Sequence, residues 1–335
     1  MRSISLEEYI AETQDFCSMS RKEISIPVIE KPAIPGRKPV SHKYSYGRAL
    51  IIGGSIGFSG APVLAANACE RSGAGLTHLM VPESIYPVAA VKCDGAVVTP
   101  LPSGNDGKIA IEALDTILPV LAKADACAIG PGLGQNEATR TIVEAVIQNA
   151  GCPLLLDADA LTACGKNMDI LKTCKVPVIL TLHEGEFSRI GGDLSQGRLQ
   201  GVLAFSKEYG NAVLVLKGYG TLVCRNGEAS VNLTGGPALA KGGSGDVLCG
   251  VICGLLAQGI DPFYAVQCGV YIHGAAGDIA AERFGDYSVT PSDLISCLPE
   301  IFKNICFPQE AVMNRAVFVR LAEIAQDHPC KIQKE

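Results

Sequence analysis

The stretch GGPALAKGGSGDVLCGVICGLLAQG, residues 235–259, joins a glycine-rich turn directly to an apolar segment with helical spacing. The first N–H groups of a helix have no intrahelical acceptor, and the helix dipole adds roughly half a positive charge at that end. Four small residues before Asp246 can wrap these donors around a phosphoryl group; they are Gly242, Gly243, Ser244 and Gly245. The pattern predicts an anion hole whose neighbouring carboxylate takes the proton from an attacking hydroxyl. The alternative, an acid that only favours the helix dipole, does not need four small residues before it.

Bulk composition narrows the class of partner. The chain has 335 residues, is 48% hydrophobic and has a net charge of −6, which suits one large α/β domain or two small ones. Lysine and arginine are scattered and aromatic residues make up only 5%, which argues against nucleic acid or an anionic membrane surface as a partner. No apolar run reaches the roughly 18 residues that span a membrane, and the polar start of the chain is unlike a signal peptide. We therefore expect a cytoplasmic protein.

The 14 cysteines show no framework of a disulfide or metal site. No CxxC pair occurs, and the closest two, Cys249 and Cys253, are four residues apart in the predicted apolar helix. Thiolate zinc sites use tighter pairs, so we expect reduced cysteines that pack as small buried side chains. The sequence identifies no set of metal ligands.

Short apolar runs alternate with helical patterns along most of the chain. Continuous apolar strands separated by helices predict a mainly parallel sheet covered on both faces. The predicted strands are 48–54, 76–81, 126–132, 153–159, 177–182 and 212–218, with a hairpin at 221–234. The predicted helices are 61–72, 109–123, 136–149, 195–209, 245–258, 262–284 and 311–326. Residues 1–45 are predicted to form an arm, which consists of an acidic helix at 5–16 and a proline-rich stretch. Residues 46–300 are predicted to form the domain and residues 301–335 a helical tail.

Glycine-rich motifs follow five of the predicted strands. Because ligands bind outside the carboxyl ends of strands in such sheets, these loops predict one cleft. GGSIGFSGAP (53–62) lacks the GxGxxG spacing, and no GxxxxGK[ST] occurs, so the standard dinucleotide and P-loop fingerprints are absent. GPGLG (130–134) can lie flat under a planar ligand through Gly132 and Gly134. Tight packing and an ordinary turn remain the alternatives for these two loops.

Three further motifs carry polar side chains. The acids of DADAL (157–161) could hold Mg²⁺ through water or receive a hydroxyl, or Asp159 could cap the following helix. His183 of TLHEGEF could donate to a carboxamide or phosphate, or be an ordinary hydrogen-bonded residue with Glu186 serving the first turn of a helix. Lys217 of KGYGT suits a nucleotide phosphate or an adenine pocket, or is a surface lysine before a turn.

Taken in order, these motifs resemble the ribokinase-like superfamily, and most closely its NAD(P)H-hydrate dehydratases, which repair hydrated nicotinamide cofactors. The resemblance runs from about Ser41 to about Leu298, through GGSIGFSGAPVLAANACERSGAGL, AIGPGLG, LLLDADAL, ILTLHEGEF, VLKGYGT, NLTGGPALAKGGSGDVLCG and GVYIHGAAGD. It implies a three-layer α/β/α sandwich around a mainly parallel sheet. It implies a hydrated-nucleotide site lined by Gly60, Ala61, Gly132, Gly134, His183 and Asp246. It also implies that the phosphate donor contacts Lys217, Gly218, Tyr219, Gly220, Thr221 and Gly245.

The resemblance implies a reaction as well. A donor nucleotide with Mg²⁺ phosphorylates the hydroxyl of hydrated NADH or NADPH, with Asp246 as base, and loss of phosphate restores the cofactor. The form of the histidine motif points to ADP, giving AMP and phosphate, rather than ATP. We expect a homotetramer and a separate epimerase for the other hydrate isomer, since 45 leading residues cannot hold an epimerase domain. Relatives differ at Leu182 and Glu184, where many have proline, and at Gly236, where many have asparagine.

Two other functions compete with this one. A small-molecule kinase of the same superfamily would phosphorylate a vitamin-precursor alcohol of the hydroxyethylthiazole or hydroxymethylpyrimidine type and stop there. A non-catalytic nucleotide-binding protein would need neither the anion hole nor Asp246, so both being intact disfavours it.

Overall fold

The computed structural model describes residues 3–5, 8–9, 11, 25–165 and 168–307. The helix predicted over 311–326 lies outside these residues, as does most of the acidic helix predicted over 5–16. Along the described part of the chain, no helix is both long and apolar enough to cross a lipid bilayer.

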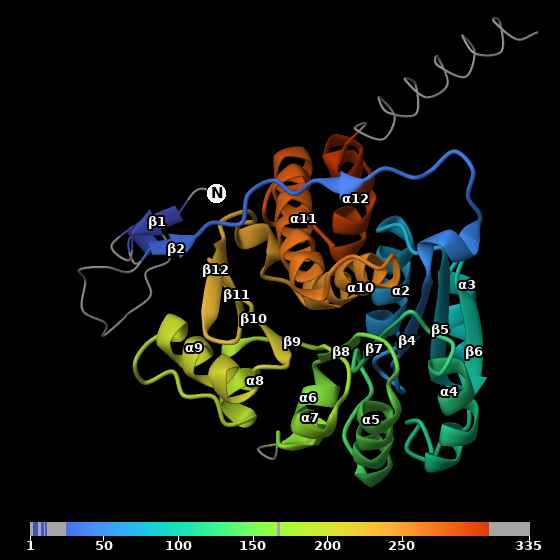
Figure 1. Cartoon of the computed structure of the whole chain (residues 1–335). Coiled ribbons are helices and arrows are strands. Elements are labelled where there is room, and N and C mark those ends of the chain that lie inside the picture. The colour runs from blue at the N-terminus through green and yellow to red at the C-terminus, as the bar shows by residue number, and fades with distance from the viewer. Residues whose placement is uncertain (1–2, 6–7, 10, 12–24, 166–167, 308–335) are drawn as a thin grey trace, which may run out of the picture.

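A nine-stranded sheet forms the middle layer of the molecule (Figure 1). Its strands stand in the order β12-β11-β10-β9-β8-β7-β4-β5-β6, with β4 to β10 parallel and β11 and β12 closing one edge as an antiparallel hairpin. The strands are β4 Arg48–Ile52, β5 Leu76–Pro82, β6 Val97–Leu101, β7 Ala126–Ile129, β8 Leu154–Asp157, β9 Val178–Leu182, β10 Ala212–Leu216, β11 Thr221–Arg225 and β12 Glu228–Asn232. The chain runs from β4 outward to β6 and returns to the other side of β4 with β7. The order therefore reverses between β4 and β7, where a ligand crevice is expected at the carboxyl ends.

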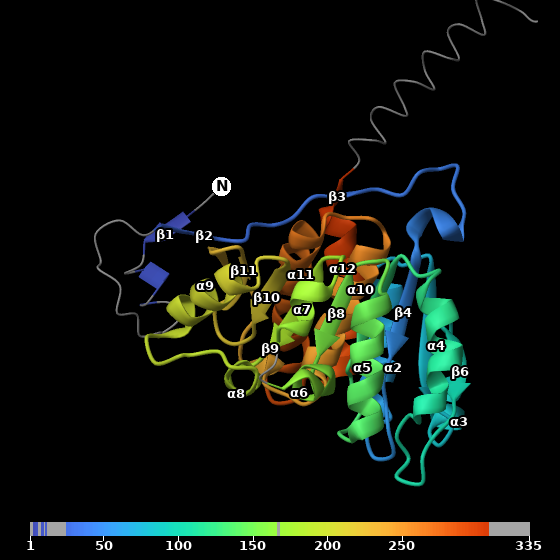
Figure 2. The ribbon, with the colours of Figure 1, turned by 60° about the horizontal axis from the view of Figure 1, so that its bottom comes forward.

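Helices cover both faces of the sheet (Figures 1 and 2). One face packs against α2 Gly60–Arg71, α3 Tyr86–Lys92, α10 Ser244–Ala257, α11 Pro262–Phe284 and α12 Pro291–Ile305. The other packs against α4 Leu114–Leu121, α5 Glu137–Asn149, α6 Asp159–Cys164, α7 Ile170–Thr173, α8 Glu184–Arg189 and α9 Arg198–Glu208. The predicted three-layer α/β/α architecture around a mainly parallel sheet is confirmed.

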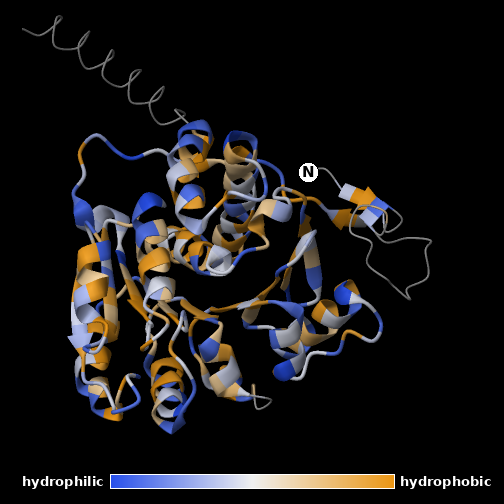
Figure 3. Cartoon of the chain, turned by 180° about the vertical axis from the view of Figure 1, so that it is seen from behind, coloured by the Kyte–Doolittle hydropathy of each residue, from blue (hydrophilic) through white to orange (hydrophobic). Residues whose placement is uncertain are grey.

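Alternate residues of each parallel strand enter different cores. In β4, Ile51 packs under α2 and α10, while Leu50 and Ile52 pack under the helices of the opposite face. Because both faces are covered, the strand is apolar at every buried position, as expected for a parallel sheet. Figure 3 shows hydrophobic residues along the strands and hydrophilic residues on the outer turns of the helices.

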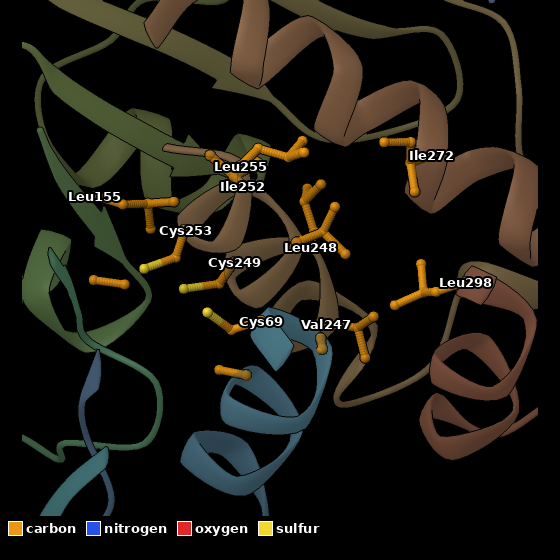
Figure 4. Close-up of a cluster of buried hydrophobic side chains, with 14 of the residues drawn as sticks. Cys69, Leu155, Val247, Leu248, Cys249, Ile252, Cys253, Leu255, Ile272 and Leu298 are labelled. Atoms are coloured by element: carbon orange, nitrogen blue, oxygen red, sulfur yellow. The ribbon is translucent and has the colours of Figure 1, made fainter. Parts of the chain in front are cut away.

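Helix α10 is the central element of the first face. It is buried along nearly its whole length, which explains why it is apolar on all sides. A side chain at Gly250 would meet the carbonyl oxygen of Ala65 at 2.1 Å, so glycine permits close packing on α2. Figure 4 shows Cys69 of α2 beside Cys249 and Cys253 of α10 in this core. All cysteines that the structure describes are free and most are buried, as the sequence predicted.

The segment before β4 packs along the domain rather than standing apart from it. Ile29 donates its N–H to the Val231 carbonyl at 2.8 Å, beside the hairpin. The chain then passes over α11 and α12 (Figure 2), where the short strand β3, Ile34–Pro35, pairs with β13, Cys306–Phe307. The division into an arm, a domain and a tail at residues 45 and 300 stays a prediction.

Several elements differ from the sequence prediction. The helix expected over 109–123 is a short 3-10 turn, Ile111–Ala113, followed by α4. The strands expected over 126–132 and 153–159 end at Ile129 and Asp157, because the glycine and acidic motifs that follow are loop and helix start. The sequence analysis missed α3, β6, α7 and α12, although Thr290 and Asp293 form a capping box that marks the start of α12.

Candidate active site

The glycine-rich turn before α10 forms the helix start that the sequence predicted. Gly243 has a left-handed backbone, φ +94°, and a side chain there would lie 2.8 Å from Leu64 and Pro291. The Ser244 N–H donates to the Lys241 carbonyl at 3.2 Å. Within the described residues, the N–H groups of Gly245 and Asp246 have no acceptor. The Gly242 and Gly243 N–H groups likewise have no acceptor there, so of the four residues predicted to form the anion hole only Ser244 has its amide already used.

His273 of α11 contacts this turn through Ser244. Its Nε2 lies 2.9 Å from the Ser244 carbonyl oxygen and 3.1 Å from Ser244 Oγ. Burial lowers the pKa of His273 to about 4, so the ring is neutral and Nε2–H donates to the carbonyl. The sequence analysis missed this residue, although a histidine inside the otherwise apolar helical run GVYIHGAAG was a usable signal.

Asp246 is partly buried in the first turn of α10. Burial and the charge of Asp157 raise the pKa of Asp246 from 3.8 to about 7, against the opposing charge of Lys217. A carboxylate with such a pKa is matched to proton removal near neutral pH.

Lys217 lies at the centre of the acidic groups. Its Nζ is 3.2 Å from Asp157 Oδ1 and 3.7 Å from Glu186 Oε2. Burial disfavours the ammonium, but the attraction of these two carboxylates raises the pKa of Lys217, which stays charged. Asp157 is itself buried and accepts the Thr181 hydroxyl at 2.7 Å. The alternative of a surface lysine is therefore wrong, because only about a fifth of the Lys217 side chain is exposed (21%).

A pocket of about 570 Å³ opens between the hairpin, the start of α10 and α11. Its size falls in the usual range for small-ligand sites. The predicted residues that line it are His183, Lys217, Gly218, Tyr219, Thr221, Ser244 and Gly245. The predicted residues Gly220, Gly242, Gly243 and Asp246 do not line it. Asn232, Gly236, Lys241 and His273 line it without having been predicted.

The remaining predicted residues meet at the switch point between β4 and β7. The Gly132 carbonyl accepts the Ser55 hydroxyl at 2.8 Å, and a side chain at Gly132, φ +65°, would lie 2.8 Å from the Phe58 carbonyl oxygen. A side chain built at Gly132 would also lie 3.3 Å from Ala61, next to Gly60 at the start of α2. The structure thus brings together Gly132 and Ala61, which the sequence analysis assigned to one substrate site.

Asp159 ties the second loop to β8. It is the first residue of α6 and makes no capping hydrogen bond for that helix, so the capping prediction is wrong. Its carboxylate instead accepts the Gly134 N–H at 2.8 Å and the Gln135 side-chain amide at 2.9 Å. The predicted residue Gly134 is therefore held in place by one of the two acids of DADAL.

His183 caps helix α8. Its Nδ1 accepts the N–H groups of Gly185, at 3.0 Å, and Glu186, at 3.3 Å. The Glu186 carboxylate accepts the His183 N–H at 2.8 Å in return, so the structural alternative for both residues is confirmed. Because Nδ1 accepts these two bonds, a ring proton lies on Nε2. The ring also lines the pocket, and its Nε2 lies 3.5 Å from Glu186 Oε1.

No group of three or more histidine, cysteine or acidic side chains able to hold a metal occurs in the described part of the chain. Asp157 and Asp159 are partnered with Lys217 and the Gly134 loop. Mg²⁺ in nucleotide enzymes is held by one or two carboxylates together with substrate phosphates, so these donors fit an ion that arrives with its nucleotide.

The fold and this site define a ribokinase-like α/β protein, and comparison with known proteins gives the particular family. The family model for NAD(P)H-hydrate dehydratase matches residues 49–300, so the chain belongs to that family, as its motifs predicted. The "Bifunctional NAD(P)H-hydrate repair enzyme Nnr" of Moorella thermoacetica is 39% identical over 277 residues, which cover 81% of this chain and 52% of that protein. The chain thus spans about half the length of such curated relatives.

Solved structures agree. The ADP/ATP-dependent NAD(P)H-hydrate dehydratase of Bacillus subtilis, co-crystallized with ATP/Mg²⁺, has a TM-score of 0.70 and 31% identity, covering 84% of this chain and 99% of its own. A ribokinase-like superfamily protein of Enterococcus faecalis has a TM-score of 0.72 and 29% identity, covering 81% of this chain and 92% of its own.

Proposed function

We propose that this chain repairs hydrated nicotinamide cofactors by nucleotide-dependent dehydration. The observation that carries the proposal is the position of Asp246. Its carboxylate has a pKa of about 7 and stands between free helix-start amides, the Lys217 ammonium and the acids at the end of β8. Membership of the NAD(P)H-hydrate dehydratase family supports this substrate class over a vitamin-precursor alcohol.

Most of the predicted residues have a place in this proposal. The donor nucleotide occupies the 570 Å³ pocket, with its phosphates against the Lys217–Thr221 loop and the amide of Gly245. The hydrated ring lies at the switch point, over Gly60, Ala61, Gly132 and Gly134, with His183 at the edge of the pocket. Asp246 then lies between the two ligands.

The proposed reaction has two steps. Asp246 takes the proton of the ring hydroxyl, whose oxygen attacks the terminal phosphorus of the donor, and the bond to the bridging oxygen breaks to release AMP from ADP. The amides of Gly245 and Asp246 and the Lys217 ammonium stabilise the migrating phosphoryl group. The ring carbon–oxygen bond then breaks with loss of a proton from the neighbouring carbon, which restores the double bond of the cofactor. Hydrated NADH and ADP thereby give NADH, AMP and phosphate.

Mg²⁺, when bound with the nucleotide, neutralises charge on the phosphates. Asp157 and Asp159, the two acids of DADAL, would hold the ion through water. We further propose ADP as the donor, a homotetrameric assembly, and a separate epimerase that supplies the correct hydrate isomer.

An absorbance assay tests the proposal. Purified protein is mixed with hydrated NADH, Mg²⁺ and either ADP or ATP, and the absorption band of the reduced nicotinamide is followed. Recovery of the band, faster with ADP, is expected. No recovery with either nucleotide contradicts the proposal, and stable phosphorylation of a thiazole or pyrimidine alcohol would favour the kinase alternative.

A further inference from the structure

The loop that forms one wall of the pocket is held from behind by a buried guanidinium. Arg198, the first residue of α9, is 9% exposed. Its Nη1 donates to the carbonyls of Tyr219, at 2.8 Å, and Gly220, at 3.4 Å. Its Nη2 donates to those of Leu216, at 3.3 Å, and Lys217, at 3.4 Å. One side chain therefore binds four carbonyl groups within five residues, at the end of β10 and in the loop that follows it.

These contacts orient the loop toward the pocket. Residues 217–219 and 221 line the pocket and Arg198 does not, so the loop separates the guanidinium from the ligand space. A trans peptide unit points its N–H opposite to its C=O. Since the carbonyls of Lys217 and Tyr219 face Arg198, the N–H groups of Gly218 and Gly220 point away from it. Neither N–H has an acceptor within the described residues, and since Gly218 lines the pocket, its N–H is left for a ligand.

Gly218 is the residue that permits this approach. Its φ is +151°, and a side chain built on it would lie 2.7 Å from Arg198 Nη2. Any larger residue would push the guanidinium away from the loop. The glycine of KGYGT and the arginine 20 positions earlier are thus parts of one arrangement.

Glu184 forms an ion pair with the other side of the guanidinium. Its Oε1 lies 3.1 Å from Arg198 Nε, and the preceding residue, His183, lines the pocket. The Lys217 N–H also donates to the Leu182 carbonyl at 2.7 Å. The two pocket walls are therefore joined twice, and Glu184, which departs from the pattern of many relatives, has its partner in this chain.

We propose that Arg198, held by Glu184, is a positioning residue for the donor nucleotide: it fixes the Lys217–Thr221 loop so that backbone N–H groups face the phosphates, without touching them itself. The identity of the ligand rests on the proposed function. Because Arg198 acts through the loop, its removal affects nucleotide binding more than the chemical step or binding of the hydrate.

Equilibrium binding of ADP tests this directly. We compare the wild type with Arg198→Met, Arg198→Lys and Gly218→Ala, with Arg140→Met, an exposed arginine on α5, as matched control. We expect the Kd for ADP to rise at least about tenfold in Arg198→Met, the scale of lost charge-assisted hydrogen bonds. The Kd of Arg198→Lys for ADP should lie between those of the wild type and Arg198→Met, because an ammonium lacks the planar fork that reaches several carbonyls. Steady-state kinetics should show a higher nucleotide KM with kcat and the hydrate KM little changed.

The outcomes separate the two proposals. A wild type that binds neither ADP nor ATP overturns both. A folded Arg198→Met that binds ADP like the wild type overturns the inference alone. If Arg198→Met does not fold, ADP binding by Gly218→Ala and Arg198→Lys tests the inference. The double variant of these two should weaken ADP binding by less than the sum of the two single effects, because both substitutions act on one contact. Additive effects, or normal binding in both, contradict the inference.

Discussion

Replacing Asp246 with asparagine should make the protein more stable and inactive at once. In the folded protein, burial and Asp157 raise the pKa of Asp246 from 3.8 to about 7, so folding favours the neutral carboxyl. The stability that this preference provides is complete below pH 3.8 and is lost as the pH rises through about 7. Asparagine resembles the neutral form at every pH.

The expected gain in the free energy of unfolding follows from the shift in the pKa of Asp246. About three pKa units at roughly 1.4 kcal/mol each give a gain of at most about 4 kcal/mol for Asp246→Asn above pH 7, and about 1–2 kcal/mol at pH 5. Urea unfolding of both proteins at pH 5 and pH 8 measures the difference. Asp193→Asn is the control, because hydrogen bonds from Ser195 lower the pKa of Asp193 and no gain with rising pH is expected.

The same substitution, Asp246→Asn, should lower the activity although it raises the stability. As a base, Asp246 must be ionised, so kcat/KM should fall about tenfold per pH unit below pH 7, and Asp246→Asn should lose at least about 10³-fold in rate. Equal stability of the two proteins at pH 8, together with a flat rate profile between pH 6 and 8, would refute this account of Asp246.

Three further substitutions probe the rest of the site. Lys217→Met should cost several kcal/mol in urea unfolding, on the order of 3, because it leaves Asp157 buried without its cation, and nucleotide turnover should fall; unchanged stability would contradict the pairing. Gly132→Ala should destabilise by about 1–3 kcal/mol and raise the hydrate KM, since φ is +65° and the Phe58 carbonyl is 2.8 Å away; a wild-type KM would exclude this loop from the substrate site. Gly236→Asn should change stability by less than about 0.5 kcal/mol, because nothing lies within 4 Å of a Cβ added at this position; a large loss would contradict that.

Local patterns predicted most of the fold. The apolar runs gave the strands of the parallel sheet, except β6, within a few residues, and the bounds predicted for α11, 262–284, are those observed. Motifs that interact with their own neighbours in sequence, such as the helix start at Gly243, were read correctly. Asp246 could be proposed as a base in this way, because a glycine-rich turn before an acidic first turn has few other uses.

Contacts between distant segments were not predictable. The partner of Asp159 is the Gly134 amide, 25 residues earlier, so a pattern that looked like a helix cap served a different loop. In the sequence, Arg198 is one of several charged residues on a predicted helix. Its role could not be predicted because its four carbonyl partners come from the end of β10 and the loop after it. Only the fold shows that the guanidinium is buried.

The central claim is that Asp246 and the amides at the start of α10 act on one phosphoryl transfer to the hydrate. Its most direct test is the stoichiometry of a single turnover, with hydrated NADH, ADP and Mg²⁺ quenched at intervals and analysed for all products. The account predicts AMP, phosphate and NADH in equal amounts from the wild type and none from Asp246→Asn. NADH regained without AMP, or AMP released equally fast by the variant, would contradict it.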